Sequence, residues 1–195
     1  MSRGLALLIG GLAGAMLSGC LLDPHVGRRP ARFHVGPNSR AVSVPRPDPD
    51  TPQPFAQKSS SPTPATPEEM QLSAKAVALQ FTMATAYPFY TGIEAETGRL
   101  ELPGSNFAAA YGVIGVDQSL GFAAIGAELA AGWQGVRYNH GDEEHSTLVA
   151  EPRLRGQLWI AEQWTLGATL GARLADGLSR DWMAGAYLGV HSHRF

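Results

Sequence analysis

Several features common in soluble enzymes and nucleic-acid-binding proteins are scarce in this chain. Its one cysteine, Cys20, excludes an internal disulfide bond. The formal net charge of -2 gives no overall basic character, so nucleic acid is not an expected partner. Charged residues make up only 16% of the sequence, whereas there are 23 glycines. Such a low charge is unusual for a soluble domain and suits a protein whose outer surface faces lipid.

The apolar run from Leu5 to Met16 is too short for a transmembrane helix, which needs about 20 apolar residues. It leads into Leu17, Ser18, Gly19 and Cys20, and this tetrapeptide resembles a bacterial lipobox. The resemblance implies that residues 1–19 are a lipoprotein signal peptide and that Cys20 carries lipid. The alternative is an ordinary secretory signal peptide in which Cys20 has no such role.

The lipobox resemblance also implies a location. Bacterial lipoproteins carry a diacylglycerol and usually a further acyl chain, and two or more chains hold a protein stably in a membrane. The residue after Cys20 is Leu21 and not Asp. By resemblance to enteric lipoproteins, this favours the outer membrane of a Gram-negative-type bacterium. The implied partners are outer-membrane lipids and the lipoprotein-processing machinery, and no cofactor is expected.

Residues 20–73 contain most of the prolines of the chain. A segment of this composition buries too little apolar surface to fold by itself, so we expect it to be largely disordered and extended. We interpret it as a spacer between membrane and domain, with a recognition tract for a partner as the alternative. Two short stretches, Arg32 to Val35 and Arg40 to Val44, interrupt the segment and are candidates for a short strand within residues 32–44.

From residue 74 to residue 195 the sequence alternates between large apolar residues and small or polar ones, with turn residues between the runs. This period of two predicts β-strands. In the clearest run, Leu148 to Ala161, the leucines share one face, and Glu151 and Arg153 share the other. Helices are the competing interpretation for the Ala-rich parts, but each of the many glycines would cost about 1 kcal/mol in a helix interior.

The lengths and faces of these runs favour a membrane-spanning barrel over a soluble one. A run of about ten residues is long enough for a tilted strand to cross a bilayer. The faces rich in Leu and Trp would point to lipid, and the faces of Gly, Thr, Glu and Arg would fill the interior. A soluble barrel needs the reverse. We therefore predict an all-β fold: a small antiparallel up-and-down transmembrane β-barrel of about eight strands in residues 74–195.

The connections between the runs alternate between long and short, as in outer-membrane barrels. From the C-terminus they are Asp176 to Asp181, Glu162-Gln163, Asn139 to Ser146, Asp117 to Ser119, Thr97 to Asn106 and Tyr87-Pro88. They separate seven strands. Because single-chain bacterial barrels normally have an even number, another strand is expected upstream, near residues 32–44. In that case the Pro-rich segment is an outside loop and not a spacer.

The 74–195 region resembles the small outer-membrane barrels of the OmpA-like and OmpX-like type. The resemblance rests on the strand pattern and on four aromatic residues, Trp133, Trp164, Trp182 and Phe195. It implies that the barrel-assembly machinery is a partner, since this machinery usually reads a terminal aromatic residue. Phe195 departs from the pattern because it shares a strand face with His191 and His193.

Charged residues on the predicted inward faces form the main candidate site. They are Glu128, Glu151, Arg153, Arg155 and Arg173. We expect the carboxylates and the guanidinium groups to pair with one another and fill the barrel interior. A polar route for a small solute is the alternative. A wide pore is not expected, since about eight strands leave an interior that side chains just fill.

Two other groups of residues are weaker candidates. A predicted outside loop holds the potential metal ligands His140, Asp142, Glu143, Glu144 and His145. Oxygen-rich loops suit hard cations and histidines suit zinc, but this spacing matches no established metal loop. A solvated acidic turn is the preferred interpretation. His191 and His193, two residues apart on one strand face, are the second candidate.

Some small outer-membrane barrels are lipid-modifying hydrolases that use a Ser, a His and a carboxylate. The pairs His145-Ser146 and His191-Ser192 suggest this comparison. Neighbours on a strand point to opposite faces, however, and cannot share a proton directly. An enzyme is therefore not expected, and the hydrolase is kept as an alternative.

The sequence thus predicts a lipid-anchored outer-membrane β-barrel with a structural, adhesive or loop-presenting role. An extracellular or periplasmic protein of unknown identity is the partner that such loops would serve. The main alternative is a lipid-tethered, soluble, lipocalin-like β-barrel that binds an apolar ligand. Loss of activity on changing Ser146 or Ser192 would instead indicate the hydrolase.

Overall fold

The computed structural model describes residues 31–45, 69–86, 88–137, 144–174 and 181–192. These residues form eight strands. Their bounds are β1 (Ala31–Pro45), β2 (Glu69–Ala86), β3 (Phe89–Leu100), β4 (Asn106–Ser119), β5 (Ala123–Arg137), β6 (Glu144–Trp159), β7 (Trp164–Ala172) and β8 (Trp182–His191). The described residues contain no helix that is long and apolar enough to cross a membrane.

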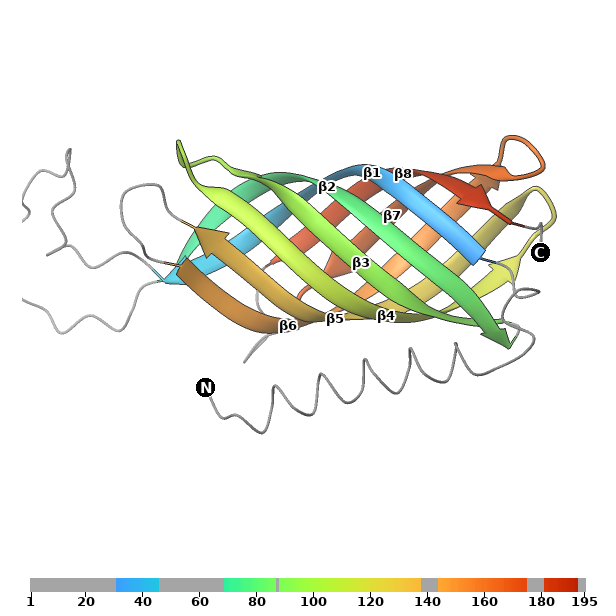
Figure 1. Cartoon of the computed structure of the whole chain (residues 1–195), viewed down its shortest axis with the longest axis horizontal. Helices are drawn as coiled ribbons and strands as arrows, with labels where there is room; N and C mark the ends of the chain where they lie inside the picture. Colours follow the sequence, from blue (N-terminus) through green and yellow to red (C-terminus); the bar gives the residue numbers. More distant parts are fainter. Residues whose placement is uncertain (1–30, 46–68, 87, 138–143, 175–180, 193–195) are drawn as a thin grey trace, which may run out of the picture.

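Each strand pairs antiparallel with the next, and β8 pairs with β1 to close the barrel (Figure 1). The predicted antiparallel barrel of eight strands is therefore confirmed. The two described ends of the chain lie side by side, because Arg32 pairs with His191. In addition, the Ser192 amide donates a hydrogen bond of 2.9 Å to the carbonyl of Ala31.

The strand expected upstream, near residues 32–44, is present as β1, but it is longer than either of the two short candidate stretches. β1 runs through both short stretches and through Gly36 and Pro37 between them, and β2 begins at Glu69. The barrel therefore begins upstream of residue 74 and includes part of the segment expected to be disordered. Pro37 is tolerated within β1 because it lacks an N–H at a point where β1 does not pair with β8. The register between the two strands skips Gly36 and Pro37. Gly36 allows the close approach, since a Cβ there would lie 1.8 Å from the carbonyl oxygen of Ala186.

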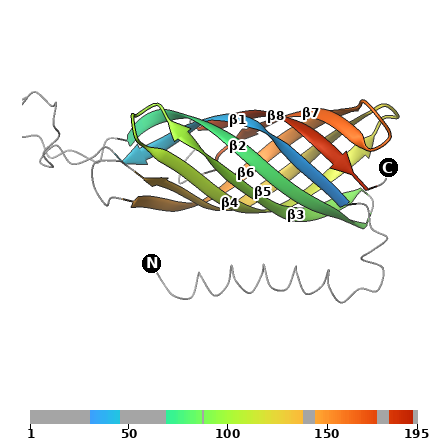
Figure 2. The ribbon, with the colours of Figure 1, turned by 45° about the horizontal axis from the view of Figure 1, so that its top comes forward.

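The connections fall into two groups at opposite ends of the barrel (Figures 1 and 2). Short turns join β2 to β3, β4 to β5 and β6 to β7, and Gly121 in the β4–β5 turn has a φ of 83° that favours glycine. We call this the short-turn end. The other connections, including residues 46–68 between β1 and β2, leave the opposite, long-connection end. The β3–β4 connection there is shorter than expected, because β3 continues to Leu100.

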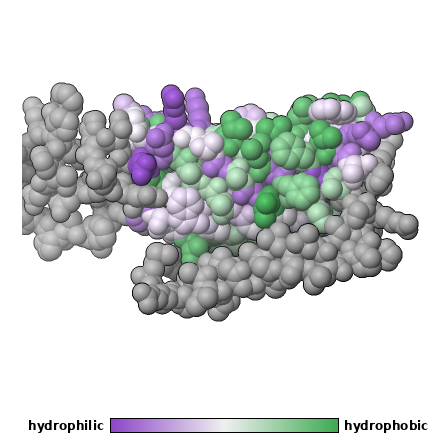
Figure 3. Space-filling model, viewed as in Figure 1, coloured by the Kyte–Doolittle hydropathy of each residue, from purple (hydrophilic) through white to green (hydrophobic). Residues whose placement is uncertain are grey.

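The polarity of this barrel is the reverse of that of a soluble protein. Large apolar side chains cover the outer wall, and hydrophilic side chains gather toward its ends (Figure 3). The exposed residues on the wall include Phe33, Leu79, Phe81, Ile93, Ile114, Leu129, Leu154, Leu170 and Leu188. Polar and charged residues, by contrast, are buried inside. The alternation predicted from the sequence thus places its large apolar face outside.

The interior is layered along the barrel axis. At the long-connection end it is apolar, with Val42, Leu72, Leu100, Phe107, Val136 and Val149 buried. The charged network described next lies beside this layer, on the side of the short-turn end. At the short-turn end, Trp159 packs against His191 with ring centroids 4.6 Å apart. No sequence pattern predicted this apolar layer, which lies between the charged network and the long-connection end.

Candidate functional site

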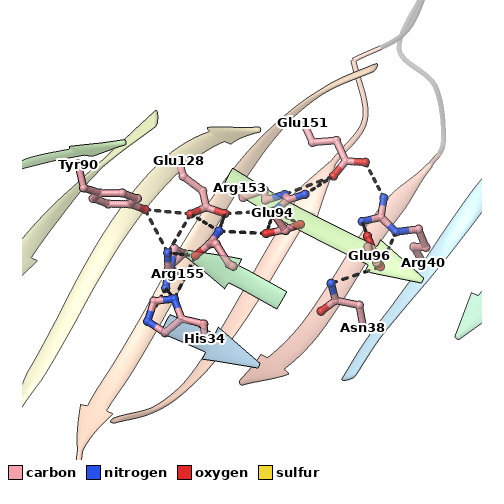
Figure 4. Close-up of polar contacts among 11 residues, drawn as sticks. His34, Asn38, Arg40, Tyr90, Glu94, Glu96, Glu128, Glu151, Arg153 and Arg155 are labelled. Atoms are coloured by element: carbon pink, nitrogen blue, oxygen red, sulfur yellow. Dashed lines mark hydrogen bonds and ion pairs between the residues drawn. The ribbon is translucent and has the colours of Figure 1, made fainter. Parts of the chain in front are cut away.

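The charged network in the interior centres on Arg153 of β6 (Figure 4). Its Nη1 atom lies 2.8 Å from Oε2 of Glu94 and 3.2 Å from Oε1 of Glu128. Its Nη2 atom lies 2.9 Å from Oε2 of Glu151. The side chain of Arg153 therefore links carboxylates from β3, β5 and its own strand. Because all four side chains are buried, each charge depends on these partners and not on water.

Arg40 extends the network to β1. Its Nη2 and Nε atoms lie 2.5 Å and 3.1 Å from the two carboxylate oxygens of Glu96, which gives a bidentate pair. Its Nη1 atom lies 2.6 Å from Oε1 of Glu151. Glu151 is thus shared between Arg40 and Arg153, so the two arginines belong to one continuous network (Figure 4). The guanidinium of Arg40 also lies 5.3 Å from the ring centroid of Phe107, against the apolar layer.

Arg155 forms the part of the network nearer the short-turn end. Its Nη1 atom lies 2.9 Å from Oε2 of Glu128 and donates a hydrogen bond of the same length to Gln80. Its Nη2 atom lies 3.0 Å from Nδ1 of His34. The hydroxyl of Tyr90 donates a hydrogen bond of 2.9 Å to Glu128, so this carboxylate is held by several neighbours at once.

A separate ion pair closes the short-turn end, where Arg32 of β1 contacts Asp117 of β4. Thr165 and His191 form a hydrogen bond of 2.8 Å beside it. Small residues make room for the large groups of this region. A Cβ at Gly115 would lie 2.3 Å from the ring of Tyr90, and one at Gly126 would lie 2.0 Å from the carboxylate of Asp117. Inward glycines therefore relieve crowding in this part of the barrel.

These ion pairs fill the lumen and hold the strands together, which suits a rigid barrel better than passage of a solute. Arg40 and Glu151 come from β1 and β6, so their ion pair crosses the lumen. Beside the network, His34, Asn38 and Tyr187 line a cavity of about 30 Å³. Such a volume is enough for one or two water molecules. Among the described residues we find no group of three or more His, Cys, Asp or Glu side chains placed to hold a metal ion.

No family of known proteins matches the sequence of this chain, and no curated protein does. Solved structures do match. Ail, the attachment invasion locus protein of Yersinia pestis, matches with a TM-score of 0.51 and 11% identity, over 86% of this chain and 99% of Ail. The two chains share a fold. Neisserial surface protein A, NspA, matches with a TM-score of 0.49 and 8% identity, over 85% of this chain and 97% of NspA.

In the barrel that this chain shares with Ail, the structure brings together four of the five interior residues expected to pair. They are Glu128, Glu151, Arg153 and Arg155. Arg173 does not join them. It lies beyond the end of β7, and its Nη1 atom lies 3.0 Å from Oδ2 of Asp181. Asp181 also accepts hydrogen bonds from the amide and the hydroxyl of Ser43, which ties β8 to β1 at the long-connection end.

Four central members of the network escaped the sequence analysis: His34, Arg40, Glu94 and Glu96. Alternation with outward apolar residues was present for three of them, His34, Glu94 and Glu96. Glu94 and Glu96 alternate with Ile93 and Ala95, which marks one polar face on β3. Arg40 lies in one of the two stretches that were candidates for a short strand, but the face to which its side chain points was not assigned. Period-two spacing gives the face of a strand, but not which side chains from distant strands meet.

Several other predicted residues lie outside the described part of the chain. They are Leu17, Ser18, Gly19, Cys20, His140, Asp142, Glu143, His193 and Phe195. Glu144 begins β6, and His145 follows it half-buried. The lipidation site and most of the weak metal candidates therefore stay predictions.

The two serine candidates lie on the outer side of the barrel. Ser146 is exposed on β6. The hydroxyl of Ser192 accepts a hydrogen bond of 2.9 Å from the amide of Ala31, whereas His191 is buried inside. His191 and Ser192 thus point to opposite sides, as expected for neighbours on a strand.

Proposed function

We propose that this protein is an integral outer-membrane barrel, further anchored by lipid at Cys20, which presents its long connections outside the cell in a structural or adhesive role. The inverted polarity of the barrel supports the proposal most strongly. Leu154 and Leu170 on the outer wall are 67% and 63% exposed, whereas Arg40 and Arg153 inside are 2% and 3% exposed. Exposed leucines on this wall are unfavourable in water, whereas in a bilayer they would contact the acyl chains of lipids.

The filled interior supports a role for the barrel as a rigid support. A lipocalin-like barrel needs an apolar cavity for its ligand, whereas ion pairs occupy the middle of this lumen. A solute route is also disfavoured, because the apolar layer with Phe107 and Val136 lies between the charges and the long-connection end. The functional surface would then be the long connections, of which residues 46–68 form the longest. Ail, whose name is attachment invasion locus protein, is an adhesive precedent for this fold.

The first experiment compares the wild type with Cys20→Ala in outer-membrane fractions, using gels of unboiled and boiled samples. We expect a band that shifts on boiling for both proteins, since a folded barrel resists detergent until heated. Labelled palmitate should enter the wild type only. A soluble Cys20→Ala protein without a heat shift would overturn the integral barrel and support a tethered soluble domain.

A second experiment tests the orientation. An epitope inserted between residues 46 and 68 should be reached by antibody on intact cells. The same epitope placed in the β4–β5 turn, at Gly121, should be reached only after the outer membrane is opened. The opposite result would reverse the barrel in the membrane and reject presentation of the long connections.

A further inference from the structure

Two cations face outward side by side near the long-connection end. Lys75 on β2 pairs directly with Arg99 on β3, and both side chains are exposed on the outer wall. Neither forms an ion pair with another described residue. Like charges at directly opposed positions destabilise a strand pair. An anion from outside the chain would remove this repulsion.

The same two residues border a groove on the outer wall. The groove has a volume of about 860 Å³ and crosses β8, β1, β2 and β3. Its apolar lining includes Pro37, Val77 and Ala186, and Ser39 and Ser73 add hydroxyl groups. Glu101 contributes one carboxylate to the lining, against the two cations. The groove therefore combines a positively charged side with a shallow apolar bed.

We propose that this groove binds one anionic, phosphate-bearing membrane lipid, with the phosphate between Lys75 and Arg99 and an acyl chain along the apolar bed. The inference rests on the proposed membrane location, because the groove lies on the wall that would face lipid. Lys and Arg side chains near a membrane surface attract anionic headgroups. A phosphate also accepts several charge-assisted hydrogen bonds from neighbouring cations.

A second outer groove shows why the charges matter. It has a volume of about 1070 Å³ and is lined by outward apolar side chains such as Phe89, Leu129, Leu154 and Leu170. The charged residues at its border, Glu128 and Arg153, have their side chains in the interior network. This surface suits any acyl chain and offers no headgroup site. The combination of cations and apolar bed distinguishes the first groove.

The row of residues that contains the two cations supplies a matched control. Arg99 pairs with Asn106 on β4, and Asn106 pairs with Arg137 on β5. Arg137 is therefore an exposed cation at the same level of the wall, but it does not line the groove. Arg137→Gln removes one positive charge, as Lys75→Gln or Arg99→Gln does at the groove.

The test uses the full chain folded in a zwitterionic detergent without phosphate. Native mass spectrometry measures the retention of phosphatidic acid and of phosphatidylcholine. We expect one retained phosphatidic acid in the wild type and a loss of affinity of about 10- to 30-fold in Lys75→Gln/Arg99→Gln. Arg137→Gln should bind as the wild type does. Ala186→Phe fills the apolar bed without changing charge and should also weaken binding.

Two results would overturn the proposal. One is equal binding by the wild type, Lys75→Gln/Arg99→Gln and Ala186→Phe. The other is displacement of phosphatidic acid by inorganic pyrophosphate at the same concentration, since that would show an anion site that does not use the acyl chain. Each variant is first checked for the heat-dependent gel shift. A folded barrel without lipid selectivity rejects this inference alone, whereas an absent shift in the wild type rejects the proposed function.

Discussion

Arg40 on β1 holds both carboxylate oxygens of Glu96 on β3, although β2 lies between the two strands. Asn38 donates a further hydrogen bond of 3.3 Å to Glu96. Removal of Arg40 would leave Glu96 buried without a cation, whereas Glu151 would keep Arg153. The pair should therefore be strongly coupled in its effect on stability.

A double-mutant cycle measures this coupling. We expect Arg40→Met to lower the free energy of unfolding by about 3–5 kcal/mol. Adding Glu96→Gln should recover part of the loss, with a coupling energy of about 1–3 kcal/mol. The measurement is a urea titration in lipid vesicles, with the folded fraction read from unboiled gels. Arg40→Met combined with Asp117→Asn, at the short-turn end, is the additive control. Equal coupling in both cycles would contradict the network.

Arg153 should be the most sensitive interior position, because it serves three carboxylates. Arg153→Met removes the cation that Glu94, Glu128 and Glu151 share. We expect a loss of at least about 3 kcal/mol in the free energy of unfolding, or failure to assemble. Arg137→Met, which removes an exposed cation, should stay within about 0.5 kcal/mol of the wild type. Similar stability of the two variants would show that the interior charges are hydrated and weakly coupled.

The sequence predicted the barrel well because the periodic signal is local. In β6 and β8, for example, the outward faces carry Leu154, Leu158 and Leu188, which are all exposed as expected. The pairing of interior charges depends instead on register around the closed barrel, which local spacing does not encode. Arg173 shows the difference. It shares the period of β7, but it lies where the strand has ended and contacts Asp181.

The proline content led to an underestimate of the length of β1, for a physical reason. Prolines argue against a central strand, since each lacks a ladder donor. Here Pro37 lies where the pairing with β8 is interrupted, and the next proline, Pro45, is the last residue of the strand. The alternation of Arg32 and His34 with Phe33 and Val35 was the better guide. Alternation reports which face is buried, whereas proline content reports only a missing hydrogen bond.

Glycines on the two faces of the barrel wall should differ in their sensitivity, since Gly115 faces inward and Gly156 shares the outward face of β6 with Leu154. At Gly115 an added Cβ would lie 2.4 Å from the hydroxyl of Tyr90, whose hydrogen bond to Glu128 holds it in place. We expect Gly115→Ala to lower the free energy of unfolding by about 1–3 kcal/mol through overpacking. At Gly156 a Cβ would have no neighbour within 4 Å, so Gly156→Ala should be neutral or slightly stabilising. Urea titration of both variants checks this, and the reverse order would show that Tyr90 moves aside at little cost.

A charge on the outer wall distinguishes a membrane barrel from a soluble one. Leu154 on β6 is 67% exposed, and in water its replacement by Arg would relieve an unfavourable apolar surface. In a bilayer the same replacement should cost about 2–4 kcal/mol near the midplane. Leu120, which is 54% exposed beside the β4–β5 turn, provides the control. Leu120→Arg should cost at most about 1 kcal/mol, since the penalty falls toward the membrane interface.

The two variants are compared by refolding into vesicles and by the fraction of heat-modifiable protein in cell membranes. We expect Leu154→Arg to reduce both strongly and Leu120→Arg to leave both near the wild-type values. The comparison separates the two environments because both variants add the same charge at an exposed leucine. If Leu154→Arg instead folded as well as Leu120→Arg, or became more soluble without loss of stability, the outer wall would face water. The interior ion pairs would then belong to a soluble barrel, and the proposed membrane location would be rejected.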